Sequence, residues 1–545
     1  MRHRVTAVTA VLAGLAAAAV AGAAALPAAA AVSARQLGPA VSAASEPSVT
    51  IKAIDREGKA VAVTASLESV ASYAVQDTLT SNHATMVPAG TYNIAAWVWE
   101  PDKKAATLVD RAITITSSVT VTFDARPGKL VRFTVNDSTV AQDAVLAEPF
   151  SAATGEATWW NNSYGPIDGP AVYVVPGALP SGWDLLLQAN LVRHETNNTA
   201  SPVEYNLVKI LSGSIPSNLN FASTRAGLAQ VHVTIRDFGQ GTDGVVFAPN
   251  EYGDGSSYGV LPSAEFGQDN VRTPASVDAF FSPGYRWESV GYAAGDDEYG
   301  TAPLLAGHTY GQTFNAAVFS PSPLFGPTVY GNSLQTTEAF GNDLLVDAAA
   351  PVDGANLGGG SVGLYPVDPQ GWLYEGSKLI EHASGYNANF TAKIPASAQT
   401  YTLKVEATQV NADNIPVGGI AKSVTATYTF KTEAGDTSLS NTNFWPRIIP
   451  QGVSEKNAAA PGSKTTVPIT FNTLNGVIAA HDVAVWASVN GGSTWTSLRV
   501  THSGSTWSVS VDNPKKAGYV SLKVQGEDAA GFKATVTAIN AYAVS

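Results

Sequence analysis

The chain has 545 residues, a formal net charge of −13 and only 14% charged side chains. A hydrophobic content of 45% excludes an intrinsically disordered chain, and the length predicts about three to four domains. The acidic balance argues against general binding to nucleic acid or anionic membranes, which needs clustered Lys and Arg. Cysteine is absent, which excludes disulfides, thiol catalysis and cysteine-based zinc sites.

Residues 1–31 have the pattern of a signal peptide. Arg2 and Arg4 precede an Ala-rich apolar stretch over about 5–25, and three alanines at 28–30 provide a small-residue cleavage site. Small residues dominate this stretch and no charged stop follows it, which disfavours a membrane anchor. We therefore expect a secreted, extracellular protein without membrane attachment after cleavage, beginning with a linker at 32–46.

Residues 47–127 alternate apolar and polar side chains around turns at 55–58 and 88–90, which predicts a β-sandwich. The next segment, 128–342, contains strand-like runs at 172–175, 231–235 and 316–319 between Gly-, Pro- and Asp-rich connections. Its residues 184–190 fit either a short helix or a buried strand. We expect 128–342 to form one large, loop-rich antiparallel β domain.

The last 200 residues repeat the same alternation. Val424 and Phe430 lie in one alternating run, and Val485, Val524 and Val536 lie in three others, with turn residues between them. Such a period of two is typical of half-buried antiparallel strands. The fold class we predict is all-β, with tandem antiparallel β-sandwich modules of the Ig/fibronectin-like and prealbumin-like kinds. The last two modules are expected at 343–436 and 437–545, the second of them Ig-like.

Several of these stretches resemble the accessory region of large secreted actinobacterial subtilisin-family serine peptidases. The segments that carry the resemblance are 87–92 (VPAGTY), 107–109 (TLV), 121–126 (VTFDAR), 306–310 (AGHTY), 314–319 (FNAAVF), 401–407 (YTLKVEA) and 517–524 (AGYVSLKV). They span most of the mature chain in the family's order. The family's catalytic Asp, His and Ser segments do not occur in this sequence. The resemblance therefore implies non-catalytic β appendages, with a separately encoded protease as one partner.

One motif supports an alternative function as a hydrolase. Ser257 is the central residue of a G-x-S-x-G sequence, the pattern of a nucleophilic serine on a strand-to-helix turn. Pro262 follows closely and opposes the helix that this turn requires. His232 and His308 are candidate bases, although an isolated histidine is more often a structural hydrogen-bonding residue. A peptidase or glycosidase would have to assemble its site from loops of 128–342.

Acidic residues in the same domain are candidates for a structural calcium site. Asp254 and the run Asp296, Asp297 and Glu298 lie in Gly-rich stretches that we expect to be loops. Ca²⁺ takes oxygen ligands at 2.3–2.6 Å, which converging loops can provide. Two of these carboxylates would also suit a glycosidase, if their separation were right. A solvated acidic loop is the simpler interpretation, and no other cofactor is expected.

Aromatic pairs offer the best sequence case for binding. Trp97 and Trp99 share one face of a predicted strand, and Trp159 and Trp160 are adjacent in the chain. Exposed rings of this kind stack on sugars or anchor peptides, so we expect a glycan or an extracellular protein as ligand. The alternative is that the rings cover a seam between domains. Asn490 lies in a single hairpin motif resembling an Asp-box, which predicts a turn closed by side-chain bonds with Trp495 beneath it.

Taken together, these patterns predict a secreted, non-catalytic multi-module β protein with a binding or accessory role.

Overall fold

The structure is a computed structural model, and it confirms an all-β protein. A short 3-10 turn, η2 (Arg225–Gly227), follows a strand in the middle of the chain. The residues that it describes are 46–72, 75–100, 102, 104–152, 171–193, 202–239, 241–252, 266–291, 296–299, 303–321, 324–325, 329–330, 333–334, 343–347, 351–355, 367–384, 388, 390–409, 419–434, 436, 444–473 and 476–545.

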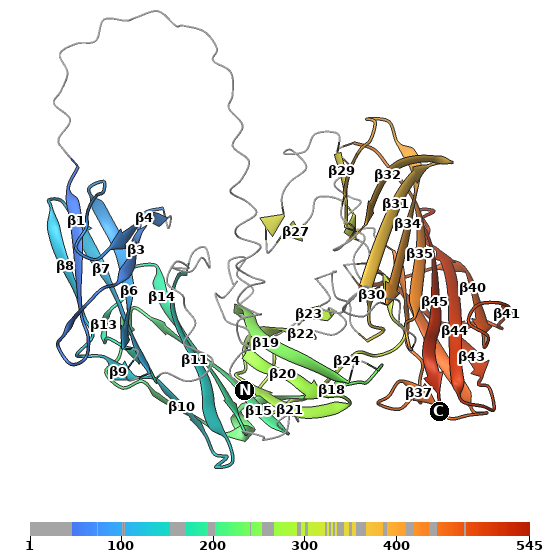
Figure 1. Cartoon of the computed structure of the whole chain (residues 1–545), viewed down its shortest axis with the longest axis horizontal. Coiled ribbons are helices and arrows are strands. Elements are labelled where there is room, and N and C mark those ends of the chain that lie inside the picture. Colours follow the sequence, from blue (N-terminus) through green and yellow to red (C-terminus); the bar gives the residue numbers. More distant parts are fainter. Residues whose placement is uncertain are drawn as a thin grey trace, which may run out of the picture.

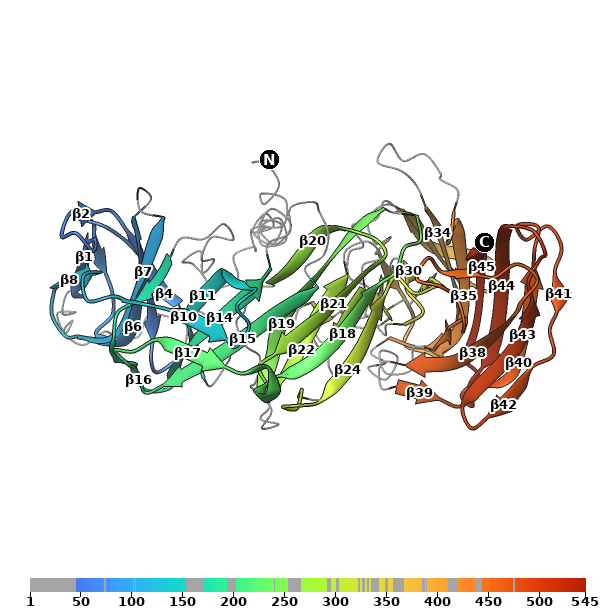
Figure 2. The same ribbon diagram turned by 90° about the horizontal axis from the view of Figure 1, so that it is seen from below.

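The N-terminal half is a stack of four sheets, seen from blue to green in Figures 1 and 2. In the first sheet β1 pairs with β2, β5 and β8, and its pairing with β8 is parallel. The strands of the first sheet are β1 (Ser48–Ile54), β2 (Ala60–Val61), β5 (Ala84–Met86) and β8 (Val119–Asp124). The strands of the second sheet, in sheet order, are β4 (Val75–Thr80), β3 (Thr64–Ser69), β6 (Gly90–Glu100), β7 (Ala105–Ile115), β12 (Ala171–Val174) and β9 (Lys129–Leu130).

The third and fourth sheets contain most of the predicted middle domain. The third sheet is mixed rather than purely antiparallel, because β15 pairs with β21, and β18 with β24, in parallel. The pairings of the fourth sheet are antiparallel. The strands of the third sheet, in sheet order, are β11 (Ala141–Ser151), β14 (Trp183–Val192), β15 (Val203–Ser212), β21 (Ala275–Phe281), β18 (Ala229–Ile235) and β24 (Thr309–Phe314). Those of the fourth sheet are β20 (Phe266–Arg272), β19 (Thr242–Tyr252), β22 (Tyr285–Gly291) and β23 (Asp296–Tyr299).

Three hydrophobic cores separate these four sheets. The first and second sheets enclose one core around Phe123, and the third and fourth enclose another around Phe281. Between the second and third sheets, Trp97 and Leu108 pack in one cluster with Leu187 of β14. The second and third sheets therefore bury apolar residues on both faces. This explains why 184–190 was ambiguous in sequence, since a strand buried on both faces shows no alternation.

The C-terminal half is a sandwich of a nine-stranded sheet and a five-stranded sheet around a single core (Figures 1 and 2). The strands of the nine-stranded sheet, in order, are β32 (Lys378–Ser384), β31 (Val367–Glu375), β34 (Gln399–Gln409), β35 (Ser423–Thr432), β45 (Lys533–Val544), β44 (Gly518–Glu527), β40 (His481–Ser488) and β41 (Thr496–Ser497), with β37 (Ala458–Ala459) beside β45. The five-stranded sheet comprises β36 (Trp445–Ile448), β38 (Lys464–Thr473), β43 (Thr506–Asp512), β42 (Thr501–Ser503) and β39 (Gly476–Ile478).

Small sheets connect and cover these units. Leu344 of β29 and Ala392 of β33 belong to the C-terminal core, beside the half of the nine-stranded sheet that precedes β45. The remaining strands are β10 (Arg132–Val135) with β17 (Asn220–Ser223), β13 (Gly177–Ala178) with β16 (Ser214–Ile215), β25 (Ser320–Pro321) with β30 (Pro351–Val352), β26 (Leu324–Phe325) with β29 (Asp343–Asp347) and β33 (Phe390–Lys393), and β27 (Val329–Tyr330) with β28 (Ser333–Leu334).

Shared sheets cross two of the expected module boundaries. Strand β12 lies beyond residue 128 but pairs with β7 of the first module. Strand β35 precedes residue 437 but pairs with β45 over seven positions, from Ser423 opposite Ile539 to Thr429 opposite Lys533. Both connections satisfy backbone groups that would otherwise lie at an open sheet edge.

A polar junction with three buried side chains, those of Asn315, Asp353 and Asn457, joins the sheet stack to the C-terminal sandwich. We use this name for Asp237, Asn315, Asp353 and Asn457. The Asn457 amide donates to the carbonyl oxygens of Asn315 (2.8 Å) and Asp237 (3.3 Å), and its Oδ1 accepts from the Ala317 N–H (2.9 Å). Asp353 Oδ2 accepts from the Ala316 N–H at 2.9 Å.

The predicted strand at 316–319 is wrong for a reason that this junction supplies. Asn315 adopts φ +61°, which ends β24. The following residues then run as irregular, fully buried backbone whose N–H groups bond to Asp353, Asn457 and the Ile448 carbonyl. The side chains of Ala317, Val318 and Phe319 belong to the C-terminal core. This stretch is therefore as apolar as a buried strand, which explains the wrong prediction.

The contact between the two sheets of the C-terminal sandwich gives a direct stability test. A Cβ on Gly526 of β44 would lie 2.6 Å from Phe471 Cε1, and Phe471 is fully buried on the opposite sheet. Gly526→Ala is therefore expected to cost about 1–3 kcal/mol of unfolding free energy through overpacking. Gly518→Ala in the same strand meets nothing within 4 Å and is the control. Equal denaturation midpoints for the two variants would contradict this packing.

Candidate functional site

The outer face of the nine-stranded sheet presents a regular array of hydroxyl groups. Alternate residues of its strands fill the core, including Val424, Ala426 and Tyr428 of β35. The residues between them point to the other face, because successive side chains of a strand alternate. We call this surface the threonine face and define it by six partly exposed residues at its centre, namely Thr402, Thr425, Thr427, Thr429, Thr535 and Thr537.

Strand register arranges these residues in straight rows across the sheet. Lys404 lies opposite Thr427, and Thr427 lies opposite Thr535. A neighbouring row runs from Thr425 to Thr537 and on to Lys523. Neighbouring residues on one face of a sheet are ~4.8 Å apart across the strands and ~6.8 Å apart along a strand, so the hydroxyls form a regular lattice with about that spacing.

An aromatic cluster flanks one end of the threonine face. The ring of Trp372 stacks on His382, with 5.2 Å between ring centroids and 16° between planes. The ammonium group of Lys404 lies 4.7 Å from the same Trp372 ring, and it pairs with Glu406 at 3.2 Å. His382 and Lys404 come from the strands on either side of Trp372, so the ring stands between them.

A second aromatic cluster flanks the other end. Lys523 places its ammonium group 5.5 Å from the ring of Trp486 and 4.9 Å from that of Trp495. The predicted turn at Asn490 holds Trp495 here, which confirms that prediction. Asn490 Oδ1 accepts from the Thr494 N–H at 2.9 Å, and Ser488 Oγ accepts from the Gly492 N–H at 3.0 Å.

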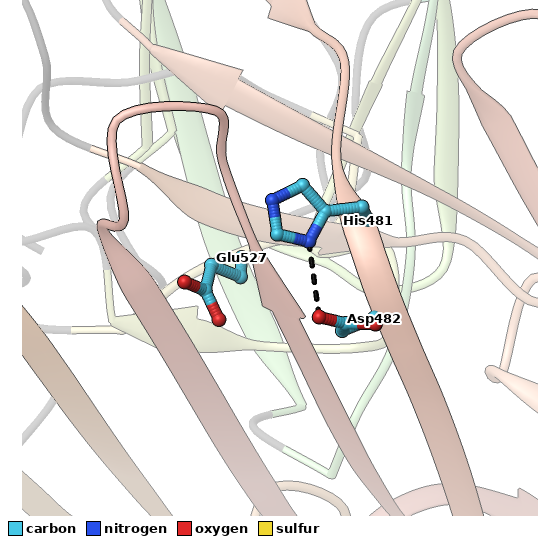
Figure 3. Close-up of side chains that lie close together, drawn as sticks. All are labelled: His481, Asp482 and Glu527. Carbon is cyan, nitrogen blue, oxygen red and sulfur yellow. Dashed lines mark hydrogen bonds and ion pairs between the residues drawn. The ribbon is translucent and has the colours of Figure 1, made fainter.

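A candidate metal-ligand cluster lies on β40 and β44, the strands that also carry Trp486 and Lys523. Figure 3 shows its three side chains. The ligand atoms of His481, Asp482 and Glu527 all lie within 4.8 Å of one another, and His481 Nδ1 is 3.2 Å from Asp482 Oδ2. A β-bulge after His481 and φ +51° at Asp482 bring these side chains together. An imidazole and two carboxylates can hold a divalent cation. However, Lys533 already pairs with Glu527 at 2.9 Å, and the Asp482 side chain is 79% exposed.

Trp97 and Trp99 share a face, as the sequence predicts, but they are not an exposed pair. Their ring centroids are 6.4 Å apart, yet Trp97 is 5% exposed and Trp99 39% exposed. Trp97 lies in the core between the second and third sheets. The alternative interpretation, that these rings cover a seam between modules, is correct for Trp97. Trp159 and Trp160 lie outside the described residues.

The other predicted site residues are not brought together by the described parts of the chain. Asp254 and Ser257 lie outside those parts, so the calcium site and the G-x-S-x-G serine remain predictions. Asp296, Asp297 and Glu298 are in strand β23, paired with β22, and not in the loop that the sequence indicated. His232 is exposed and lies 3.0 Å from Asp278 Oδ1, while His308 Nδ1 contacts the Ala306 carbonyl at a turn.

Sequence reasoning missed the threonine face, although its signal is visible. The sequence analysis used the apolar residues of β35 and β45 to predict strands and did not consider the residues between them. The intervening positions are threonine at 425, 427 and 429 and again at 535 and 537. Their alignment depends on β35 pairing with β45, across more than a hundred residues of sequence, which no local pattern indicates.

No protein-family model matches this sequence, and no curated protein matches it. Among solved structures, the chain is similar to an Escherichia coli alpha-2-macroglobulin activated by porcine elastase, at 10% identity and a TM-score of 0.14, covering 91% of this chain and 53% of that one. A Salmonella alpha-2-macroglobulin reacted with methylamine is also similar, at 10% identity and a TM-score of 0.18, covering 92% and 40%.

This chain thus spans about half of the first structure's length and less of the second's. Similarities at these TM-scores carry no conclusion about its function. The described part of the chain contains no helix with the length and hydrophobicity that a membrane crossing requires.

Proposed function

We propose that this chain is a secreted, non-catalytic protein that binds a neutral polysaccharide through the threonine face. The observation that carries the proposal is the regular, partly exposed lattice of six threonines on one sheet face. Each hydroxyl is both a donor and an acceptor of hydrogen bonds, as are the hydroxyls of a sugar. Each threonine also offers a methyl group that can contact the apolar edge of a sugar ring.

The charges on the face favour a neutral ligand. Lys404 pairs with Glu406 and Lys533 with Glu527, so four of its charged groups are neutralised in place. Lys523 lies over two tryptophan rings. Lys523 adds a single positive charge, so a polyanionic or polycationic ligand would find little surplus of opposite charge here.

The shape of the face favours a polysaccharide over a protein partner. Protein hot spots are dominated by Trp, Tyr and Arg anchors that enter well-packed pockets. Here the Trp372 ring stands between His382 and Lys404, and the centre of the face is made of short hydroxyl side chains. A flat polymer can lie across this centre with its edges against the two aromatic clusters.

Secretion is inferred from the signal-peptide pattern of residues 1–31, which lie outside the described part of the chain. The resemblance to the accessory region of subtilisin-family peptidases is compatible with an extracellular binding role. An accessory role beside a separately encoded protease is the competing outcome in the test below.

Co-sedimentation with insoluble neutral polysaccharides tests the proposal, with cellulose, chitin and starch granules as probes. The wild-type chain is expected to sediment with at least one of them. The double variant Thr427→Arg/Thr535→Arg should lose at least tenfold in affinity, because two long cations stand at the centre of the lattice. Thr120→Arg is the matched control, since Thr120 is an exposed strand threonine on the first sheet. Thermal melts check that each variant is folded.

Three outcomes would contradict the proposal. The first is equal sedimentation of the double variant and the wild type. The second is failure to bind any neutral polysaccharide while a peptidase is recovered from culture supernatant. The third is release of soluble sugar or cleaved peptide by the purified chain, which would show that it is an enzyme.

A further inference from the structure

Strand register divides the threonine face and its two aromatic clusters into three rows, each crossing the six strands from β31 to β40. The first row contains Trp372, Lys404, Thr427, Thr535, Gln525 and Ala484. The second contains Gln370, Glu406, Thr425, Thr537, Lys523 and Trp486. The third contains Tyr374, Thr402, Thr429, Lys533, Glu527 and His481. The rows differ in how many of their polar groups are already paired.

The third row pairs polar groups with one another. The hydroxyl oxygens of Thr402 and Thr429 lie 3.4 Å apart, which allows a hydrogen bond between them. The Lys533 ammonium group lies 2.9 Å from a Glu527 carboxylate oxygen. This row therefore has less hydrogen-bonding capacity left for a ligand than its central residue types suggest.

The centres of the first two rows hold four hydroxyl groups that remain available. They belong to Thr425, Thr427, Thr535 and Thr537, which face one another across β35 and β45. These hydroxyls make no hydrogen bond with another residue in the part of the chain that the structure describes. Each can both donate and accept a hydrogen bond, so the four together can bind several hydroxyls of a sugar chain.

The aromatic rings that flank the face lie in the same two rows. Trp372 begins the first row on β31, and Trp486 ends the second row on β40. Five strand spacings separate these two strands, which is ~24 Å at ~4.8 Å per spacing. The four available hydroxyls lie on the two middle strands, β35 and β45. A ligand that contacts both rings and these hydroxyls is therefore linear and runs across the strands.

The twist of a sheet favours a single chain over a flat crystal surface. Figure 1 shows the six strands side by side in this order. Adjacent strands in a sheet are rotated by roughly 20–25° relative to one another, and this rotation accumulates across the sheet. A line that crosses the middle of the strands stays nearly straight under such a twist, whereas positions on either side of it leave a common plane. One extended chain can follow that line, but the face of a crystal cannot.

We propose that the threonine face binds one extended chain of equatorially linked neutral pyranose rings, which is the linkage of cellulose and chitin. The chain lies across the strands from Trp372 to Trp486. Its rings repeat at nearly the strand spacing, so successive rings meet successive strands. An axially linked chain such as amylose coils into a helix and loses this match. The inference rests on the proposed binding of a neutral polysaccharide and specifies its linkage and its direction on the sheet.

Calorimetric titration of the purified chain with soluble oligosaccharides tests this inference. The probes are the disaccharides and hexasaccharides of cellulose and of chitin, with maltohexaose as the axially linked control. For at least one of the two series, the hexasaccharide is expected to bind at least tenfold tighter than the disaccharide, because only the longer chain reaches both aromatic rings. Maltohexaose should bind at least tenfold more weakly than that hexasaccharide.

A pair of valine substitutions tests the role of the available hydroxyls. Thr427→Val/Thr535→Val keeps the shape of both side chains and removes their hydroxyls, so it should weaken hexasaccharide binding about tenfold. Thr120→Val/Thr122→Val is the matched control, because both residues are exposed strand threonines on the first sheet. Valine is well suited to strands, and thermal melts check that both variants are folded.

The outcomes separate this inference from the proposed function. Equal affinity for disaccharide and hexasaccharide, equal affinity for maltohexaose, or wild-type affinity of Thr427→Val/Thr535→Val would overturn the inference. Sedimentation with starch granules alone, or with insoluble polymers but no soluble chain, would also overturn it while leaving the proposed function intact. Failure to bind every neutral polysaccharide, soluble or insoluble, would overturn both.

Discussion

Replacing Asn457 with alanine is expected to lower the free energy of unfolding by about 3–5 kcal/mol. The Asn457 side chain makes four hydrogen bonds within the polar junction, to the backbone of Asn315, Asp237 and Ala317 and to Arg236. Its removal leaves buried backbone groups unpaired, at about 1–3 kcal/mol each before relaxation. Alanine also tolerates the φ of +50° at this position less well than asparagine.

Two further substitutions separate these contributions. Asn457→Gly removes the strain of a positive φ but leaves the hydrogen bonds broken, so it should recover only about 1 kcal/mol relative to alanine. Asn82→Ala is the matched control, because Asn82 also has a positive φ (+62°) but is exposed. Urea denaturation measures all three. A cost for Asn457→Ala no greater than that for Asn82→Ala would contradict the role of this side chain in joining the two halves.

Replacing Asp110, which is buried in β7, with asparagine is expected to stabilise the protein above neutral pH. Burial raises the pKa of Asp110 from 3.8 to about 7, and the neighbouring Asn93 amide and the Arg111 N–H oppose this rise only in part. The unfolded chain therefore loses this proton near pH 4, whereas the folded chain keeps it until about pH 7. The contribution of Asp110 to stability falls as pH rises between these two values and is constant above the higher one.

The size of this effect follows from the same two pKa values. One pKa unit corresponds to about 1.4 kcal/mol, so the penalty above pH 7 is of the order of 4 kcal/mol. Asparagine does not ionise, so the stability advantage of Asp110→Asn should grow from pH 4 to pH 7 and then level off. Denaturant unfolding at half-unit pH steps measures it. A pH-independent difference between variant and wild type would disprove the assignment. The same measurement on Glu68→Gln shows how much of the pH dependence comes from Glu68, a buried carboxylate on the neighbouring strand β3.

Local patterns were most informative where a strand is buried on one face only. Val485, Val524 and Val536 alternate with polar residues, and each lies in the predicted strand with its side chain in the core. The turn at Asp55 also formed as the sequence indicated, since Asp55 Oδ1 accepts from two backbone N–H groups and Gly58 has φ +86°. In these cases, the physical cause lies within a few residues of the position being predicted.

Local patterns failed where the partner is distant. Trp97 was expected to be partly exposed because the opposite face of its strand was already apolar, but a second core formed by the third sheet covers it. Residues 316–319 resembled a strand because they are apolar, yet they are irregular and buried by contacts to Asp353 and Asn457. Alternation in the sequence indicates that one face of a strand is buried. It does not indicate whether another sheet also covers the opposite face.

The amino-acid sequence by itself determined the all-β class, most strand positions in the C-terminal sandwich and the turns, because these depend on side-chain alternation and on backbone preferences of adjacent residues. Only the tertiary structure decided that the sheets stack with shared cores and that β35 joins β45 to align the threonines. Each of these depends on pairing between segments far apart in the chain, and strand pairing is set by the whole fold.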